Sequence, residues 1–147
     1  MNVLIADNQG ITRAGLMYIL QSVNEVESRC VANKAGLIEE LKSCPNGVVI
    51  VDYTLFDIND AAELLVLGDR FPTACWLLFS DDLSTDFIRL VLASSTRFGI
   101  VLKDSPLSEI RMAISTALSG QRYICQRVTE LLLRPERKEE IVKLTAT

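Results

Sequence analysis

The sequence contains no histidine. Histidine is the usual general base of enzymes and a member of most catalytic triads, so its absence removes the commonest hydrolytic mechanisms. The four cysteines are scattered along the chain, and no two of them form a Cys-x-x-Cys pair. This spacing argues against a zinc site and favours reduced thiols in a cytoplasmic protein, with Cys75 in the core.

The chain also lacks an excess of positive charge and any long apolar run. Its 15 Lys and Arg residues against 19 Asp and Glu residues give a net charge of −4 at pH 7. Since binding to nucleic acid needs a basic patch, we do not expect this chain to hold DNA by itself. No apolar run approaches a membrane span, and the N-terminus has no features of a signal peptide, so no membrane contact is expected. The 147 residues, 49% of them hydrophobic, suit one domain with a sizeable core.

The central feature of the sequence is the run Val48-Val49-Ile50-Val51, which ends at Asp52. Four β-branched apolar residues in a row are typical of a strand that is buried on both faces of a parallel sheet. Ligands of open α/β sheets bind beyond the carboxyl ends of such strands. The pattern therefore places Asp52 at the rim of the core, facing the usual position of a binding site.

Five predicted strands alternate with five predicted helices. The strands are expected at residues 3–6, 26–32, 47–52, 74–79 and 98–102. The first helix is expected to pack inward through Ile11, Ala14, Gly15 and Tyr18. The later helices are expected to be capped by Asn33, by Asp57 or Asn59, by Ser84 and by Ser105. This strict alternation predicts an α/β fold, with helices on both faces of a parallel sheet.

Polar residues recur at the carboxyl ends of four of the predicted strands: Asp7-Asn8, Asp52, Ser80 and Lys103. Neighbouring strands lie about 4.8 Å apart, so these side chains are expected to meet at one edge of the sheet. Two carboxylates and an amide oxygen are suitable ligands for Mg²⁺. A carboxylate can also accept a phosphoryl group, whose charge the metal, the lysine and the serine hydroxyl can neutralise.

With these motifs, the sequence resembles the receiver domain of two-component response regulators. The resemblance covers about residues 2–119 and depends on Ala6-Asp7-Asn8, Ile50-Val51-Asp52, Ser80 and the run from Val101 to Ser105. It implies a flavodoxin-like (βα)5 doubly wound sheet with strand order 2-1-3-4-5. It also implies phosphoryl transfer from a sensor histidine kinase to Asp52, followed by a conformational switch and the formation of a homodimer on activation. Ser80 and Lys103 would act on the phosphoryl group, and Mg²⁺ would bind Asp7, Asn8, Asp52 and the backbone carbonyl of Thr54. Such a receiver is not an enzyme beyond slow self-catalysed phosphotransfer and dephosphorylation.

The last residues of the chain resemble one particular subfamily of response regulators. Residues 1–122 are predicted to form the receiver domain. Residues 123–147 are predicted to form a short helix, with Val128, Leu131 and Leu132 on one face, and a charged linker. Residues 141–147 resemble the approach to a LuxR-type helix-turn-helix, as in the NarL/FixJ subfamily. The resemblance implies control of transcription through a DNA-binding domain that this chain does not include.

Four positions depart from the family pattern, and they leave alternatives open. Asn8 replaces the second acid of the first-strand pair, Ile100 replaces the usual aromatic switch residue, and Phe56 and Asp60 replace a proline and a glycine. One alternative is a degenerate receiver that acts as a phosphorylation-independent interaction or dimerisation module, through its fourth helix, fifth strand and fifth helix. Another is a haloacid dehalogenase-like phosphohydrolase with Asp52 as nucleophile, although that family places its nucleophile near the start of the chain.

Overall fold

The computed structural model describes residues 1–54, 56–81 and 83–133. In this part of the chain, five parallel strands form one sheet in the order β2-β1-β3-β4-β5. The strands are β1 (Asn2–Ala6), β2 (Glu27–Cys30), β3 (Val48–Val51), β4 (Cys75–Ser80) and β5 (Phe98–Leu102). This topology confirms the predicted flavodoxin-like arrangement, because the order reverses between β1 and β3 and creates the crevice in which such folds bind ligands.

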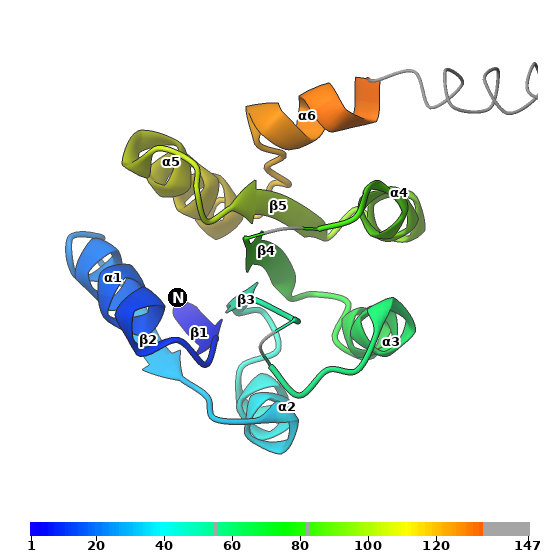
Figure 1. Cartoon of the computed structure of the whole chain (residues 1–147). Helices are drawn as coiled ribbons and strands as arrows, with labels where there is room; N and C mark the ends of the chain where they lie inside the picture. Colours follow the sequence, from blue (N-terminus) through cyan, green and yellow to red (C-terminus); the bar gives the residue numbers. More distant parts are fainter. Residues whose placement is uncertain (55, 82, 134–147) are drawn as a thin grey trace, which may run out of the picture.

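Helices cover both faces of the sheet. They are α1 (Gly10–Gln21), α2 (Lys34–Ser43), α3 (Ala61–Arg70), α4 (Thr85–Ser94), α5 (Leu107–Leu118) and α6 (Gln126–Leu133). Helices α1 and α5 lie on one face, and α2, α3 and α4 lie on the other (Figure 1). Strands β3, β4 and β5 are buried along their whole length, which explains why their sequences are almost continuously apolar. No helix in the described part of the chain is long and apolar enough to cross a membrane.

Helix α1 packs through a different face from the one that its spacing predicts. Ile11 is 86% exposed and Tyr18 is 69% exposed, whereas the buried side chains are Leu16, Ile19 and Leu20. The helix carries two apolar stripes, and the stripe of large aliphatic residues faces the sheet. The prediction chose the stripe that contains Ala14 and Gly15, which has less apolar surface to bury.

Two of the four predicted helix caps are confirmed. Asn33 accepts a hydrogen bond from the backbone N–H of Gly36, and Ser84 accepts one from Phe87. Helix α3 is instead capped by Asp60, so both candidates, Asp57 and Asn59, were wrong. The reason is that the Asp57 carboxylate accepts a hydrogen bond of 2.6 Å from the backbone N–H of Lys34, at the start of α2.

The prediction for the start of α5 was also wrong. The N-cap residue is Pro106, with an extended ψ of 149° and no side-chain cap, and the helix begins at Leu107. The helical conformation is sterically disfavoured for a residue that precedes a proline. Ser105 accordingly lies in a turn, in which its N–H donates to the carbonyl oxygen of Leu102. The helix ends as predicted at Gly120, whose φ of 79° suits glycine.

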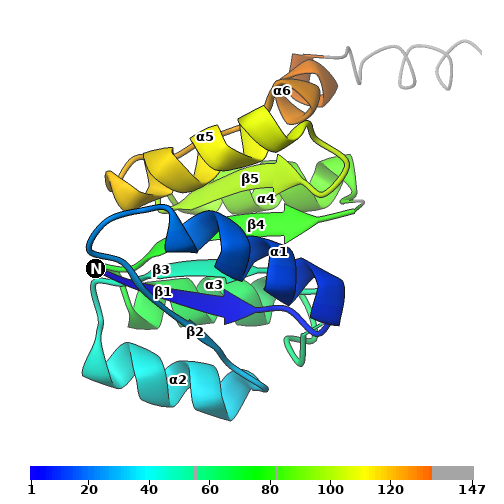
Figure 2. The ribbon, with the colours of Figure 1, turned by 90° about the vertical axis from the view of Figure 1, so that its left-hand side faces the viewer.

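The predicted sixth helix is present as α6, and Val128 is its fully buried residue. It lies beyond β5, at the edge of the sheet between α4 and α5 (Figures 1 and 2). The predicted linker after this helix, and the segment 141–147 that resembles the start of a LuxR-type domain, lie outside the described residues.

Candidate functional site

The carboxyl ends of four strands bring the predicted site residues together. In the sheet register, Ala6 lies beside Val51, Val51 beside Leu78, and Ser80 beside Leu102. The residues that end or follow these strands therefore meet at one edge. Asp7, Asp52 and Ser80 are the buried polar residues of the described chain, each at most 1% exposed. Burial of polar groups costs free energy unless they are paired, so their partners define the site.

Asp52 is held by donors from two directions. Its Oδ1 accepts hydrogen bonds from the Ser80 hydroxyl at 2.8 Å, from the Thr54 hydroxyl at 2.5 Å and from the Thr54 backbone N–H at 3.1 Å. Its Oδ2 lies 2.9 Å from Nζ of Lys103. The carboxylate is therefore fixed in orientation. The hydroxyl of Ser80, which was predicted to act on the phosphoryl group, already contacts this carboxylate.

The ammonium group of Lys103 is shared by the two carboxylates of the site. Its Nζ lies 2.9 Å from Oδ2 of both Asp7 and Asp52, and it donates a hydrogen bond of 2.7 Å to the side-chain oxygen of Gln9. Burial by itself lowers the pKa of Lys103, but the hydrogen bonds to Asp52 and Asp7 outweigh it, and the pKa is raised above the ordinary value of 10.5. Lys103 is therefore positively charged at neutral pH.

Gln9 is a member of the site that the sequence analysis missed. Its side chain contacts Lys103, and its backbone N–H donates a hydrogen bond of 2.8 Å to Oδ1 of Asp7. Gln9 is the N-cap residue of α1, and its side chain forms no cap hydrogen bond but accepts one from Lys103. Its place directly after Asp7-Asn8 was an available signal, because residues that open the helix after a strand surround the ligand crevice in this fold.

Asn8 and Thr54, the other two predicted metal ligands, are exposed at the rim of the site. The side-chain oxygen of Asn8 accepts a long hydrogen bond of 3.5 Å from Arg13, whose Nε also donates to the Asp7 carbonyl oxygen at 2.5 Å. Thr54 contacts Asp52 through its hydroxyl and amide. Coordination of a metal by the Thr54 carbonyl or the Asn8 amide stays a prediction.

The donor set suits a magnesium ion that is held by few protein charges. Within the described residues there is no group of three or more Asp, Glu, His or Cys side chains placed to hold a metal. The site offers the two carboxylates of Asp7 and Asp52. Mg²⁺ in phosphoryl-transfer sites takes one or two carboxylates and completes its shell with phosphate oxygens and water, so the residues present fit this ion.

The departures from the receiver pattern have structural consequences. Ile100 is fully buried, so this position does not carry an aromatic ring that could turn between exposed and buried orientations. An aromatic pair lies elsewhere: Tyr53, directly after Asp52, stacks on Phe87 of α4 with ring centroids 4.4 Å apart. Phe56 joins the core, and Asp60 caps α3.

Together, the strand order and the cluster of two acids, a serine and a lysine at the strand ends define the class: the chain has the fold of a response-regulator receiver domain. Solved structures agree. The RcsB response regulator of Salmonella typhimurium matches 99% of this chain and 77% of its own, with a TM-score of 0.78 and 22% identity. The isolated REC domain of RcsB from Salmonella enterica serovar Typhimurium, with the phosphomimetic BeF3⁻, matches 90% and 98%, with a TM-score of 0.76 and 22% identity. A LuxR-family response regulator from Aurantimonas sp. SI85-9A1 matches 95% and 97%, with a TM-score of 0.75 and 17% identity.

Among curated proteins, the chain is similar to the oxygen regulatory protein NreC of Staphylococcus aureus (strain JH9). The two are 24% identical over an alignment of 138 positions, and the match covers 90% of this chain. The chain spans 62% of the length of NreC. No protein-family model matches the chain. At these identities, the likeness establishes the receiver fold.

Proposed function

We propose that this chain is the receiver of a response regulator, which accepts a phosphoryl group on Asp52 from a histidine kinase and then changes conformation. The observation that carries the proposal is the buried cluster of Asp7, Asp52, Ser80 and Lys103. Two buried carboxylates around one ammonium, next to a hydroxyl donor, match the needs of phosphoryl transfer, which are positioning and charge neutralisation.

In the proposed reaction, an oxygen of Asp52 attacks the phosphorus of a phosphohistidine. A new O–P bond forms, the N–P bond breaks, and the imidazole leaves. The ammonium of Lys103 neutralises one phosphoryl oxygen, and the Ser80 hydroxyl turns to donate to another. Mg²⁺, when bound by Asp7, Asp52, the Asn8 amide oxygen and the Thr54 carbonyl, would supply further neutralisation of the phosphoryl charge. Slow self-catalysed hydrolysis of the aspartyl phosphate, in which water attacks the phosphorus, the bond to the Asp52 oxygen breaks and inorganic phosphate leaves, is part of the same proposal.

We assign residues 1–122 to the receiver and residues 123–147 to a helix and linker that lead to a DNA-binding domain. A solved structure shows two RcsB dimers bound to two parallel DNAs. By analogy, we propose that the longer protein forms a homodimer on activation and contacts DNA through a LuxR-type domain. Its kinase partner and a cytoplasmic location are predictions of the same kind.

The phosphohydrolase alternative is not favoured, because Asp52 directly follows the third strand of a receiver fold and does not lie near the start of the chain. The degenerate-receiver alternative draws support from Asn8 and Ile100. However, the surface that it would use, formed by α4, β5 and α5, is in contact with residues 122–133 of the same chain. Phosphorylation is therefore the better-supported function.

The test is the intact mass of the protein after treatment with acetyl phosphate and Mg²⁺. The wild-type chain should gain one phosphoryl group, and Asp52→Asn should gain none. Asp81→Asn, which changes an exposed acid directly after Ser80, is the matched control and should be labelled like the wild type. Labelling of Asp52→Asn at the wild-type level would disprove the assignment of Asp52, and absence of labelling in the wild type would disprove the function.

A further inference from the structure

Gln9 contacts both partners of the Asp7–Lys103 ion pair. Its backbone N–H donates a hydrogen bond of 2.8 Å to Oδ1 of Asp7, and its side-chain Oε1 accepts one of 2.7 Å from Nζ of Lys103. Asp7 follows β1 and Lys103 follows β5, and these strands are not neighbours in the sheet. A single residue therefore connects an acid and a lysine that come from separate strands.

The start of α1 does not explain why residue 9 is a glutamine. Gln9 is the N-cap residue of this helix, yet its side chain forms no cap hydrogen bond. Three other helices, α2, α3 and α4, are capped by side chains of types that N-caps favour, namely Asn33, Asp60 and Ser84. Glutamine is not among these favoured types. The contact with Lys103 therefore accounts for the side chain at position 9 better than helix capping does.

A second donor fixes the side-chain oxygen of Gln9. The hydroxyl of Thr12, in the first turn of α1, donates to the same Oε1 at 3.1 Å. An amide oxygen has two lone pairs. Thr12 and Lys103 therefore use both of them, so the oxygen is held in place and has no lone pair left for a metal ion.

Lys103 has three acceptors around its ammonium group in the described part of the chain, and Gln9 is the uncharged one. Nζ lies 2.9 Å from Oδ2 of Asp7 and 2.9 Å from Oδ2 of Asp52, in addition to its hydrogen bond to Gln9. These three acceptors match the three N–H donors of an ammonium group. Nζ also lies 5.8 Å from the centroid of the Phe79 ring. The position of the lysine is thus set by two carboxylates and one amide oxygen.

The two charged acceptors are the same groups that fit Mg²⁺. Apart from its contact with Lys103, Oδ2 of Asp7 is buried without a hydrogen-bond partner in the described part of the chain. Mg²⁺ in phosphoryl-transfer sites is bound through one or two carboxylates. A carboxylate that coordinates a divalent cation attracts a neighbouring ammonium less, and the two cations repel each other. The ion pairs of Lys103 are therefore weakest when the metal is bound.

We propose that Gln9 is a positioning residue that retains Lys103 at the site while Asp7 and Asp52 coordinate Mg²⁺. This inference rests on the proposed function, in which Lys103 neutralises a phosphoryl oxygen. A hydrogen bond to a neutral oxygen does not depend on the charge of the carboxylates, so it persists when they are neutralised. It keeps Nζ beside Asp52, where the ammonium can exchange its contact with Oδ2 for one with a phosphoryl oxygen. Gln9 thus acts through the lysine.

The retention of Lys103 is measured by the exchange of its ammonium protons with water, which is followed in ¹H–¹⁵N NMR spectra of the lysine side chains. Lys103→Arg identifies the signal by its loss. Gln9→Met keeps an unbranched side chain but removes the oxygen acceptor. At saturating Mg²⁺, exchange in Gln9→Met should be about fivefold faster than in the wild type, the effect of one hydrogen bond. Without Mg²⁺ the two should differ by less than about twofold, because both carboxylates then hold the lysine.

Gln21→Met is the matched control, because it makes the same substitution at the exposed last residue of α1. Its exchange should equal that of the wild type with and without Mg²⁺. Equal exchange in Gln9→Met and the wild type at saturating Mg²⁺ would overturn the inference. An equal acceleration with and without Mg²⁺ would also overturn it, because Gln9 would then stabilise the lysine whatever the metal does.

Failure of the proposed function gives a different result. Calorimetric titration measures the binding of Mg²⁺ to each protein, and intact mass after treatment with acetyl phosphate measures phosphorylation. If the exchange rates are as expected but the wild type gains no phosphoryl group, the phosphoacceptor function is disproved and the retention of Lys103 by Gln9 stands. If the wild type is phosphorylated but Gln9→Met shows no Mg²⁺-dependent exchange, the function stands and the role of Gln9 is disproved. A wild type that binds no Mg²⁺ would also disprove the role of Gln9.

Discussion

Lys103 and Asp7 form an ion pair of 2.9 Å inside the protein, with side chains that are 8% and 1% exposed. Asp52 shares the same ammonium at the same distance. Two buried carboxylates thus face one cation, and the repulsion between them is only partly compensated. We expect Asp7→Asn to raise the free energy of unfolding by about 1 kcal/mol in buffer without Mg²⁺, because the variant keeps an acceptor for the Gln9 N–H and leaves one balanced ion pair. Urea unfolding measures the change, with Asp69→Asn on the surface as control. A lower free energy of unfolding for Asp7→Asn would show that Lys103 needs both partners.

Ser80 and Thr54 donate to the same oxygen of Asp52, so they form a matched pair of sites for mutation. Ser80→Ala removes a donor that is fully buried, and Thr54→Val removes one at the exposed rim. Each should lower the stability by no more than about 1 kcal/mol, since the other donor remains. Both variants should still be phosphorylated, but only Ser80→Ala should respond weakly in conformation to beryllofluoride. Chemical-shift changes in α4 measure the response. A full response in Ser80→Ala would exclude the hydroxyl as the coupling element.

Asn8→Asp should restore the second acid of the first-strand pair and strengthen the binding of Mg²⁺. A carboxylate is a better ligand for a hard cation than a neutral amide, and we expect a gain of about 1 kcal/mol, or about fivefold in affinity. Calorimetric titration of both proteins with Mg²⁺ measures the difference. Arg13, whose guanidinium lies beside Asn8, provides a check, because Arg13→Gln should strengthen binding in either background by removing a nearby positive charge. Equal affinities in the wild type and in Asn8→Asp would mean that residue 8 does not contact the ion.

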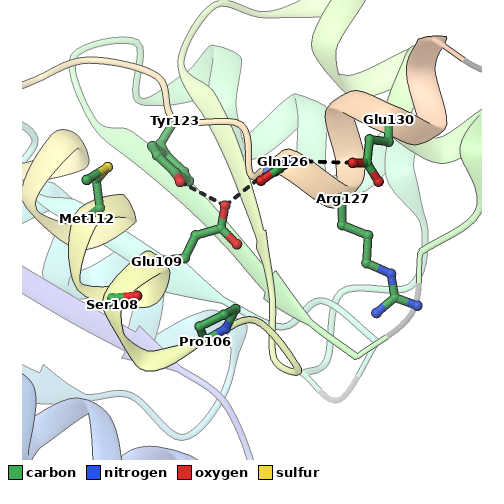
Figure 3. Close-up of a pocket in the computed structure, with 8 residues that line it drawn as sticks. All are labelled: Pro106, Ser108, Glu109, Met112, Tyr123, Gln126, Arg127 and Glu130. Atoms are coloured by element: carbon green, nitrogen blue, oxygen red, sulfur yellow. Dashed lines mark hydrogen bonds between the residues drawn. The ribbon is translucent and has the colours of Figure 1, made fainter.

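The hydroxyl of Tyr123 should lose its proton only at an unusually high pH. Burial, followed by the hydrogen bond to the Glu109 carboxylate (Figure 3), raises its pKa from 10.0 to about 12. Because the folded state holds the proton more tightly than the unfolded state, this group contributes its full stabilisation below pH 10, and the contribution is lost as the pH rises from about 10 to about 12. Absorbance titration of the wild type and of Tyr123→Phe isolates the phenolate signal of this residue. An apparent pKa near 10 would show that the Tyr123–Glu109 hydrogen bond is not formed.

Strand ends were the most predictable part of the molecule. The continuous apolar runs could be placed in a parallel sheet, and parallel strands bring their last residues to one edge whatever the helices do. Asp7, Asp52, Ser80 and Lys103 therefore came together as expected. Helix faces and helix starts were harder to predict, since α1 carries two apolar stripes and Asp57, Asn59 and Asp60 are all good capping residues. The choice among them depends on tertiary neighbours, such as the Lys34 N–H that engages Asp57.

The packing of residues 122–133 against β5 could be predicted only in part. The periodicity of Val128, Leu131 and Leu132 indicated a helix, and Gly99 inside a strand was a signal of close backbone approach. Neither pattern identifies the segment that approaches, because both patterns are local and the hydrogen bonds of Ile100 with Tyr123 and Cys125 join residues that are distant in the sequence.

The backbone N–H of Ile100 in β5 donates to the Tyr123 carbonyl, and its carbonyl accepts from the Cys125 N–H. This pairing has a consequence for solubility. The opposite edge of the sheet, β2, is protected from strand addition by its exposed charged residues Glu27 and Arg29. Strand β5 is buried and apolar throughout and has no charged residue of its own. A chain shortened to end at Gly120 would leave the N–H and carbonyl of Ile100 unpaired on an apolar edge, and such edges recruit strands from other molecules. Residues 122–133 therefore protect the protein from aggregation by covering this edge.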